Sequence, residues 1–154
     1  LEEFVECYKY MSEKADKIAI SFDYSLYIND LFAGNPSEPQ LNKWFKYSRG
    51  RLFIFDYLNG LGILNHKKPH HCLGASLPGE FRGYTRAPFK CIESIDTSNP
   101  VVYALLKGKY PESIFEIKEK DTTKLKNLIT TPKSDKLIVD AISNIVQFRT
   151  QNGL

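Results

Sequence analysis

The sequence is poor in cysteine and methionine and has no long apolar run, and each shortage excludes a class of protein. Its three cysteines, Cys7, Cys72 and Cys91, are scattered and odd in number, which does not suit a disulfide framework and favours a reducing compartment. No apolar run approaches the roughly 20 residues of a membrane span, and no segment has the pattern of a signal peptide. We therefore expect an intracellular protein, cytoplasmic rather than secreted, with no membrane partner.

Internal repeats and low-complexity tracts are also missing. The length of 154 residues is about that of one domain, and an apolar fraction of 42% is enough for one buried core. The chain begins at Leu1, and its only methionine is Met11. We therefore expect residues 1–154 to form a single domain that is a fragment of a longer polypeptide.

Apolar residues recur at helical spacing at both ends of the chain. Near the N-terminus, an amphipathic helix is predicted from the spacing of Leu1, Val5, Tyr8, Met11, Ala15 and Ile18. Near the C-terminus, Ser134 is a helix cap and Gly153 follows the helix end. The buried stripe predicted for this last helix is Leu137, Ile138, Ala141, Ile142, Ile145 and Phe148.

Glycine, proline and capping residues divide the middle of the chain into shorter elements. A capping box at Ser37 and Gln40 predicts a helix that breaks at "YSRG" before a second helix begins. The further predicted helices are 24–34, 49–60, 99–107 and 122–129, and the predicted strands are 61–65, 89–96 and 112–120. A loop is expected at 65–88. The fold class is therefore α+β, with N-terminal helices, a small central sheet and a C-terminal helix.

Charge is unevenly distributed along the chain. Residues 1–42 carry eight acidic groups and three lysines, whereas residues 43–90 carry nine basic groups and two acidic ones. Residues 91–154 are nearly balanced. A basic third indicates an anionic partner. The acidic first third indicates a different class, a protein-interaction or inhibitor module whose N-terminal helix contacts a basic protein.

The function that this pattern favours is polyanion binding, above all nucleic-acid binding, through residues 43–90. Residues 79–90 alternate cations with aromatic side chains, which suits phosphate contact and base stacking. The predicted nucleic-acid contacts are Lys43, Lys46, Arg49, Arg51, Lys67, Lys68, Arg82, Tyr84, Arg86 and Lys90.

The heptapeptide "HKKPHHC" at residues 66–72 contains all three histidines of the chain. Zinc takes four ligands in a tetrahedron, and His66, His70, His71 and Cys72 offer suitable atoms. Three of them are consecutive, however, so they do not converge easily on one ion. We therefore expect no metal and no other cofactor.

The same histidines suit an alternative function, the cleavage of RNA without a metal. An imidazole transfers protons readily near neutral pH, and neighbouring cations stabilise a phosphate. The catalytic residues would then be His70, His71, Arg82 and Arg86. The plan of N-terminal helices and a sheet bearing His, Arg, Lys and Tyr resembles that of barnase- and colicin-type RNase toxins. This resemblance implies a ribonuclease or another phosphodiesterase.

Two other segments resemble parts of known families. "FEIK" is similar to the E-x-K element of the PD-(D/E)XK nucleases, which implies a divalent metal shared by Glu116 and an upstream acid, for which Asp96 is the candidate. Residues 37–64 and the loop after them resemble a winged-helix unit. That resemblance implies that Arg49 and Arg51 begin a helix in the major groove, with a wing at residues 67–68.

Overall fold

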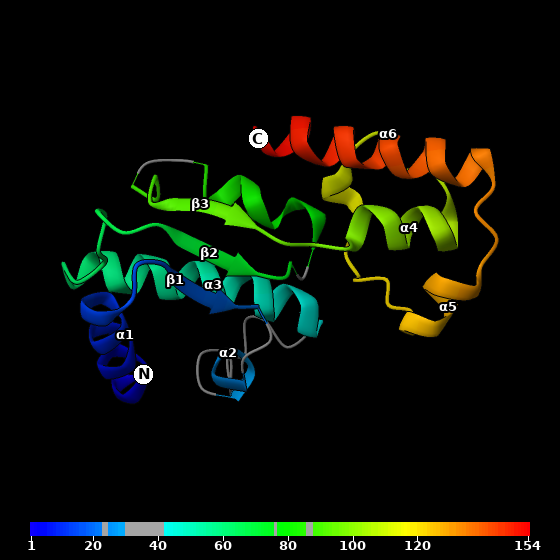
Figure 1. Cartoon of the computed structure of the whole chain (residues 1–154). Helices are drawn as coiled ribbons and strands as arrows, with labels where there is room; N and C mark the ends of the chain where they lie inside the picture. The colour runs from blue at the N-terminus through cyan, green and yellow to red at the C-terminus, as the bar shows by residue number, and fades with distance from the viewer. Residues whose placement is uncertain (23–24, 30–41, 76, 86–87) are drawn as a thin grey trace.

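The computed structural model describes residues 1–22, 25–29, 42–75, 77–85 and 88–154. The fold is α+β, as predicted, with helices at both ends of the chain (Figure 1). In chain order the elements are α1 (Glu2–Lys14), β1 (Ile18–Ser21), α2 (Ser25–Asn29), α3 (Lys43–Gly60), β2 (His70–Leu73), the 3-10 helix η1 (Pro78–Gly83), β3 (Ile92–Ile95), α4 (Asn99–Lys107), the 3-10 helix η2 (Ile114–Glu116), α5 (Leu125–Thr130) and α6 (Asp135–Asn152).

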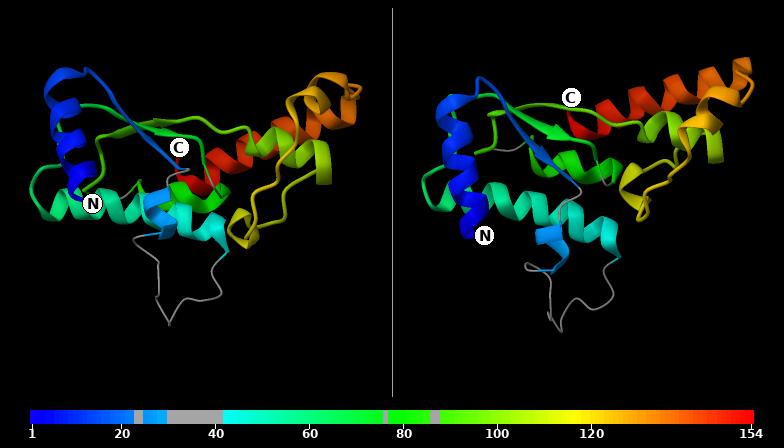
Figure 2. Two further views of the ribbon diagram at one scale, coloured as in Figure 1. Left: turned by 90° about the horizontal axis from the view of Figure 1, so that it is seen from below. Right: turned by 60° about the horizontal axis from the view of Figure 1, so that its bottom comes forward.

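The strands that the structure describes form one parallel sheet in the order β1-β2-β3. Helix α3 connects β1 to β2 and runs back along one face of the sheet (Figures 1 and 2). Along the strands, Ile18 pairs with His70 and His70 with Ile92. All three strands therefore end on the same side of the molecule, which is where the N-terminus of α3 also lies.

The two faces of the sheet differ in burial. Ile18, Ile20 and Cys72 are at most 5% exposed and belong to the main core with Phe55 and Leu58 of α3. On the opposite face, Ala19 and Leu73 are exposed. Strand side chains alternate between faces, so His70 points into the core and His71 lies on the open face.

Strand β2 lies within the segment that the sequence predicts as loop, so that prediction is wrong. "HHCL" contains two histidines and one exposed leucine, and neither alternation nor an apolar run is evident in it. The strand forms because His70 and Cys72 fill the core between β1 and β3. The predicted strand at 61–65 is not a strand either; its first two residues form a turn that closes α3.

Helix α3 is continuous through "YSRG", so the predicted break there is wrong. Its cap is Asn42, whose Oδ1 accepts hydrogen bonds from the amides of Trp44 and Phe45, both at 3.1 Å; Ser37 lies outside the described residues. Position 50 within the helix requires glycine, because a Cβ there would lie 2.5 Å from Cβ of Tyr27. The glycine therefore allows α2 to pack closely against α3. Because α3 is one continuous helix, it does not provide the two helices that the winged-helix interpretation requires.

The predicted strand at 112–120 is also wrong, because this segment contains η2 instead. The amide of Ile114 donates to Oε1 of Gln151 on α6 at 2.9 Å, so its backbone is held by a side chain and not by a neighbouring strand. Glu116 and Lys118 therefore lack the strand that the E-x-K resemblance requires. The helices predicted at 99–107 and 122–129 are confirmed as α4 and α5.

Helix α6 begins and ends as predicted, but its buried face is not the predicted one. Ser134 Oγ accepts from the amide of Leu137 at 3.2 Å, and Gly153 ends the helix with φ of 73°. Phe148 is buried as expected, whereas Ile138, Ile142 and Ile145 are exposed. The buried side chains of α6 are Asp140, Asn144, Phe148 and Asn152.

Polar side chains of α6 are buried because the chain that follows α4 lies along this helix, and its backbone groups need hydrogen bonds. Asn144 Oδ1 accepts from the amide of Tyr110 at 2.7 Å, and its Nδ2 donates to the carbonyl of Gly108 at 3.0 Å. Gln147 and Gln151 donate to the carbonyl of Glu112 at 3.0 and 2.7 Å. Buried backbone groups require partners, so the amide face of α6 turns inward. Among the described helices, none is long and apolar enough to span a membrane.

Candidate functional site at the carboxyl end of the sheet

His70 has a structural role, because both of its ring nitrogens are bound inside the core. Its Nδ1 lies 2.9 Å from the carbonyl of Lys68, which can only accept, so Nδ1 carries the proton. Its Nε2 then accepts from the hydroxyl of Tyr8 at 2.9 Å. Burial lowers the pKa of His70 and favours the neutral ring. The structure therefore places this predicted catalytic residue away from solvent, at 0% exposure.

His71 lies on the open face between two polar side chains, Ser94 in β3 and Asp96 directly after β3. Its Nδ1 is 2.9 Å from Oγ of Ser94, and its Nε2 is 3.0 Å from Oδ1 of Asp96. Lys17 donates from Nζ to the same Ser94 oxygen at 3.4 Å. We refer to Lys17, Ser94, His71 and Asp96 as the polar row. The sequence pointed to His71 and Asp96 separately, and the register of β2 and β3 brings them together.

Asp96 orients His71. Partial burial opposes ionisation of Asp96, but the amide of Gly74, which donates to Oδ1 at 2.9 Å, and the His71 ring outweigh it and lower the pKa of Asp96. The carboxylate is therefore ionised at neutral pH and accepts from Nε2–H of His71. Nδ1 is then the nitrogen that can take a proton from a hydroxyl, which is the position of a general base.

A buried ion pair underlies the carboxyl ends of the strands. Arg51 donates from Nε to Oε1 of Glu80 at 2.8 Å, and its Nη groups bind the carbonyls of Ile20, Leu73 and Gly74 at 2.8 to 3.0 Å. Both charged side chains are 0% exposed. Arg51, a predicted nucleic-acid contact, thus holds together the ends of β1 and β2 from inside.

Tyr84 belongs to the same buried cluster. Its hydroxyl donates to Oε1 of Glu80 at 3.1 Å, and burial followed by the Glu80 charge raises the pKa of Tyr84 far above its usual range. The residue is 3% exposed. The structure therefore places this predicted base-stacking side chain in the core.

Lysines lie over aromatic rings at the N-terminus of α3. Lys43 Nζ is 4.5 Å from the centre of the Trp44 ring, and Lys120 Nζ is 3.8 Å from the Phe22 ring and 5.9 Å from Trp44. Lys118 Nζ is 5.5 Å from the Phe45 ring. We define this lysine–aromatic cluster as Phe22, Lys43, Trp44, Phe45, Lys118 and Lys120.

Three chain segments build this cluster, namely Phe22 after β1, the start of α3 and residues 118–120. Asn42 Nδ2 donates to the carbonyl of Lys118 at 2.7 Å, which fixes residues 118–120 beside the start of α3. The sequence indicated Lys43, but Lys118 and Lys120 were missed because their segment was predicted as a surface strand. A cation is attracted to the face of an aromatic ring. The sequence does not reveal these contacts, because Lys118 and Lys120 are more than 70 residues from their rings.

The cluster and the polar row adjoin through Gly74. A Cβ on Gly74 would lie 2.4 Å from Cδ1 of Phe22, so the Phe22 ring packs directly on this glycine, whose amide binds Asp96. The cluster, Gly74 and Asp96 thus lie at the carboxyl ends of parallel strands, and Lys17, which precedes β1, extends the polar row from the other end. Ligands bind at the carboxyl end of open parallel sheets, which makes it the candidate functional site.

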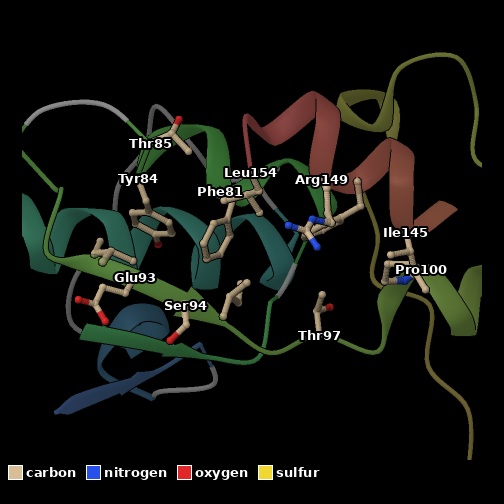
Figure 3. A pocket seen from close by; sticks show the side chains of 13 residues that line it. Phe81, Tyr84, Thr85, Glu93, Ser94, Thr97, Pro100, Ile145, Arg149 and Leu154 are labelled. Carbon is tan, nitrogen blue, oxygen red and sulfur yellow. The ribbon is translucent and has the colours of Figure 1, made fainter. Parts of the chain in front are cut away.

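A cavity of about 640 Å³ lies beside the site, between β3, η1 and the C-terminal end of α6 (Figure 3). Phe81 and Phe148 contribute apolar wall, while Ser94, Thr97 and Arg149 contribute polar groups. Ser94 lines this cavity and also contacts His71, so it is the residue that the cavity and the polar row share. A volume of this size is typical of small-ligand pockets.

The other predicted basic contacts do not share one surface. Lys67 and Lys90 are exposed and precede β2 and β3, at the amino end of the sheet. Lys68 Nζ binds the carbonyl of Ala15 at 2.6 Å, and Arg82 lies over the Phe115 ring at 5.0 Å. Lys46 and Arg49 are on the first turns of α3, partly buried and exposed respectively. Arg86 is outside the described residues.

The histidines and cysteines do not converge. His66 Nε2 is 3.1 Å from Oδ1 of Asn59, His70 and Cys72 point into the core, and His71 faces the other side of the sheet. Burial raises the pKa of Cys72 to about 12. Within the part of the chain that the structure describes, no three His, Cys, Asp or Glu side chains are grouped so that they could hold a metal ion.

Comparisons of the chain with family models, curated proteins and solved structures found no match.

Proposed function

We propose that this domain binds single-stranded nucleic acid at the carboxyl end of its sheet, through the lysine–aromatic cluster. The observation that carries the proposal is the contact of Lys43 and Lys120 with the Trp44 and Phe22 rings. Single-stranded nucleic acids present phosphates and unpaired bases together, and they bind to grooves where cations alternate with aromatic faces. A base would stack on a ring while the lysine above it moves to a phosphate.

The charge distribution supports this choice of ligand. The basic third of the sequence includes Lys43 and Lys46 at the start of α3, and Lys118 and Lys120 extend their surface from a different segment. No acidic residue occurs in the first turn of α3. The helix N-terminus therefore adds its own partial positive charge to that of the lysines.

Mapping a ten-nucleotide RNA onto the ¹⁵N-labelled domain by NMR tests the location. We expect the largest chemical-shift changes at Lys43, Trp44, Lys118 and Lys120, with smaller ones at Gly74. The matched reference region is Lys67 and Lys90 at the amino end of the sheet. Changes centred there, or none at low salt, would exclude the proposed site.

A second candidate function is metal-independent RNA cleavage, and the contact of His71 with Asp96 favours it. A 2′-hydroxyl of RNA bound beside the row would replace the Ser94 hydroxyl at Nδ1 of His71, give its proton to that nitrogen and attack the adjacent phosphorus. The bond from phosphorus to the 5′-oxygen would break, and that oxygen would take a proton from the imidazolium. The products would be a 2′,3′-cyclic phosphate and a 5′-hydroxyl. Detection of these products in EDTA tests this function.

A further inference from the structure

Helix α6 exposes an apolar stripe. The exposed fractions along it are 46% for Ile138, 57% for Val139, 57% for Ile142, 40% for Ile145 and 57% for Val146. Monomeric proteins expose single apolar residues routinely, but a contiguous patch marks an interaction surface. Five β-branched side chains on a helix of 18 residues form such a patch.

The stripe lies on the face of α6 opposite its contacts with the rest of the fold. Asp140 and Asn144 are buried against α4 and the chain after it. At 100° per residue, Ile142 points away from both of them. In Figures 1 and 2, α4 lies along one side of α6, and no described element covers its other side.

Apolar residues of the stripe occur at the same distances, three and four residues, before and after Ile142. In an antiparallel pair of identical helices related by a two-fold axis at Ile142, residues equally far before and after it face each other. Ile138 then faces Val146 of the second copy, four residues from the centre on either side, and Val139 faces Ile145. Each of these pairs is apolar, and Ile142 faces itself.

The charges at the two ends of the stripe follow the same symmetry. Asp135 and Arg149 are each seven residues from Ile142, and both are exposed at helix positions on the side of the stripe, where Arg149 also borders the cavity beside β3. The two-fold axis therefore brings Asp135 of one copy opposite Arg149 of the other, at both ends of the pair. A parallel pair would instead place like charges together.

We propose that α6 is the interface of a homodimer, in which two copies of this chain pack their α6 helices antiparallel about Ile142. The stripe extends over about half of the roughly 27 Å of an 18-residue helix. One helix pair is a small interface, in the size class of transient complexes. The dimer is therefore reversible, and it exchanges with monomer as the protein is diluted.

Sedimentation velocity over a dilution series measures the dimer. The wild-type domain is expected to shift from dimer to monomer on dilution, and Ile142→Asp to remain monomeric throughout. The matched control is Ile129→Asp on α5, because Ile129 is 71% exposed and outside the stripe; it should dimerise like wild type. Far-UV circular dichroism verifies that both variants are folded. A wild type that is monomeric even at about 1 mM overturns the proposal.

A charge swap tests the two-fold axis itself. Asp135→Arg and Arg149→Asp should each weaken the dimer at least tenfold, because each places like charges together at both ends. The double variant should recover most of the wild-type affinity. Both reversals also oppose the helix dipole, so recovery in the double variant cannot come from the helix alone. If the double variant is as weak as the single ones, the antiparallel pair is wrong.

Discussion

Arg51 and Glu80 form an ion pair with no exposure to solvent, directly beneath the ends of two strands. Burial opposes the charge on Arg51, but the Glu80 carboxylate outweighs it and raises the pKa of Arg51 above its usual value. The Arg51 guanidinium is therefore charged in the folded state. Because the guanidinium also binds strand carbonyls, it fixes the end of the sheet on which the candidate site is built.

Removing one partner of this pair should strongly destabilise the protein. Glu80→Ala leaves a buried guanidinium without its counter-ion, which costs about 3–5 kcal/mol in the free energy of unfolding. Urea unfolding followed by circular dichroism measures this change. Arg51→Met combined with Glu80→Leu should lose much less than the two single changes together, because no charge is then buried alone. Additive losses would contradict an energetically coupled pair.

The burial of His70 predicts a dependence of stability on pH. Its pKa is lowered in the fold from about 6.5 in the unfolded chain. As pH falls below about 6.5, the unfolded state binds a proton that the folded state does not, so the free energy of unfolding decreases until the folded pKa is reached. Urea titrations should show this loss in wild type and a flatter profile in His70→Asn. Equal slopes would mean that His70 is not the group responsible.

Two glycines of α3 should respond oppositely to alanine. At Gly50 a Cβ would lie 2.5 Å from Tyr27, whereas at Gly60 nothing lies within 4 Å. Gly50→Ala should therefore destabilise the protein by about 1–3 kcal/mol through overpacking, and Gly60→Ala should be neutral or stabilising by up to about 1 kcal/mol. Thermal unfolding compares the two variants. Tolerance of alanine at both positions would contradict the close contact between α2 and α3.

The polar row predicts which histidine matters if RNA is cleaved. His71→Asn should reduce the rate in EDTA at least about 100-fold, since a general base contributes about 10²–10⁴. Asp96→Asn should also reduce it, because the ring loses its orienting carboxylate. His66→Asn is the matched control and should leave the rate unchanged. Cleavage that persists in His71→Asn would exclude the row as its source.

The sequence predicted elements whose signals are local. The Ser134 cap of α6 and the glycines that end α4 and α6 are encoded within a few residues, and both helices are found where expected. Strand β2 was missed because its stability comes from two neighbouring strands and from the core, not from its own composition. The buried face of α6 is rotated from the predicted one, because amide side chains there satisfy the backbone of residues 108–114, a requirement that no helical pattern reveals.

The candidate site was only partly predictable for the same reason. Lys43 and His71 were singled out by charge and residue type, but their partners Lys120 and Asp96 come from distant segments. Arg51 and Tyr84 were assigned to the surface because cations and tyrosines usually have a polar group in solvent. A partner such as Glu80 allows both to be buried, and spacing in the sequence does not identify it.

The salt dependence of RNA binding tests the central proposal most directly. Fluorescence anisotropy with a labelled ten-nucleotide RNA, from about 50 to 200 mM salt, gives the slope of log affinity against log salt. For Lys43→Ala with Lys120→Ala, we predict weaker binding and a slope shallower by about 0.7 for each lost phosphate contact. Lys67→Ala with Lys90→Ala removes the same charge at the other end of the sheet and should keep the wild-type slope. A wild type that does not bind at low salt, or equal losses in both variants, would contradict binding at the lysine–aromatic cluster.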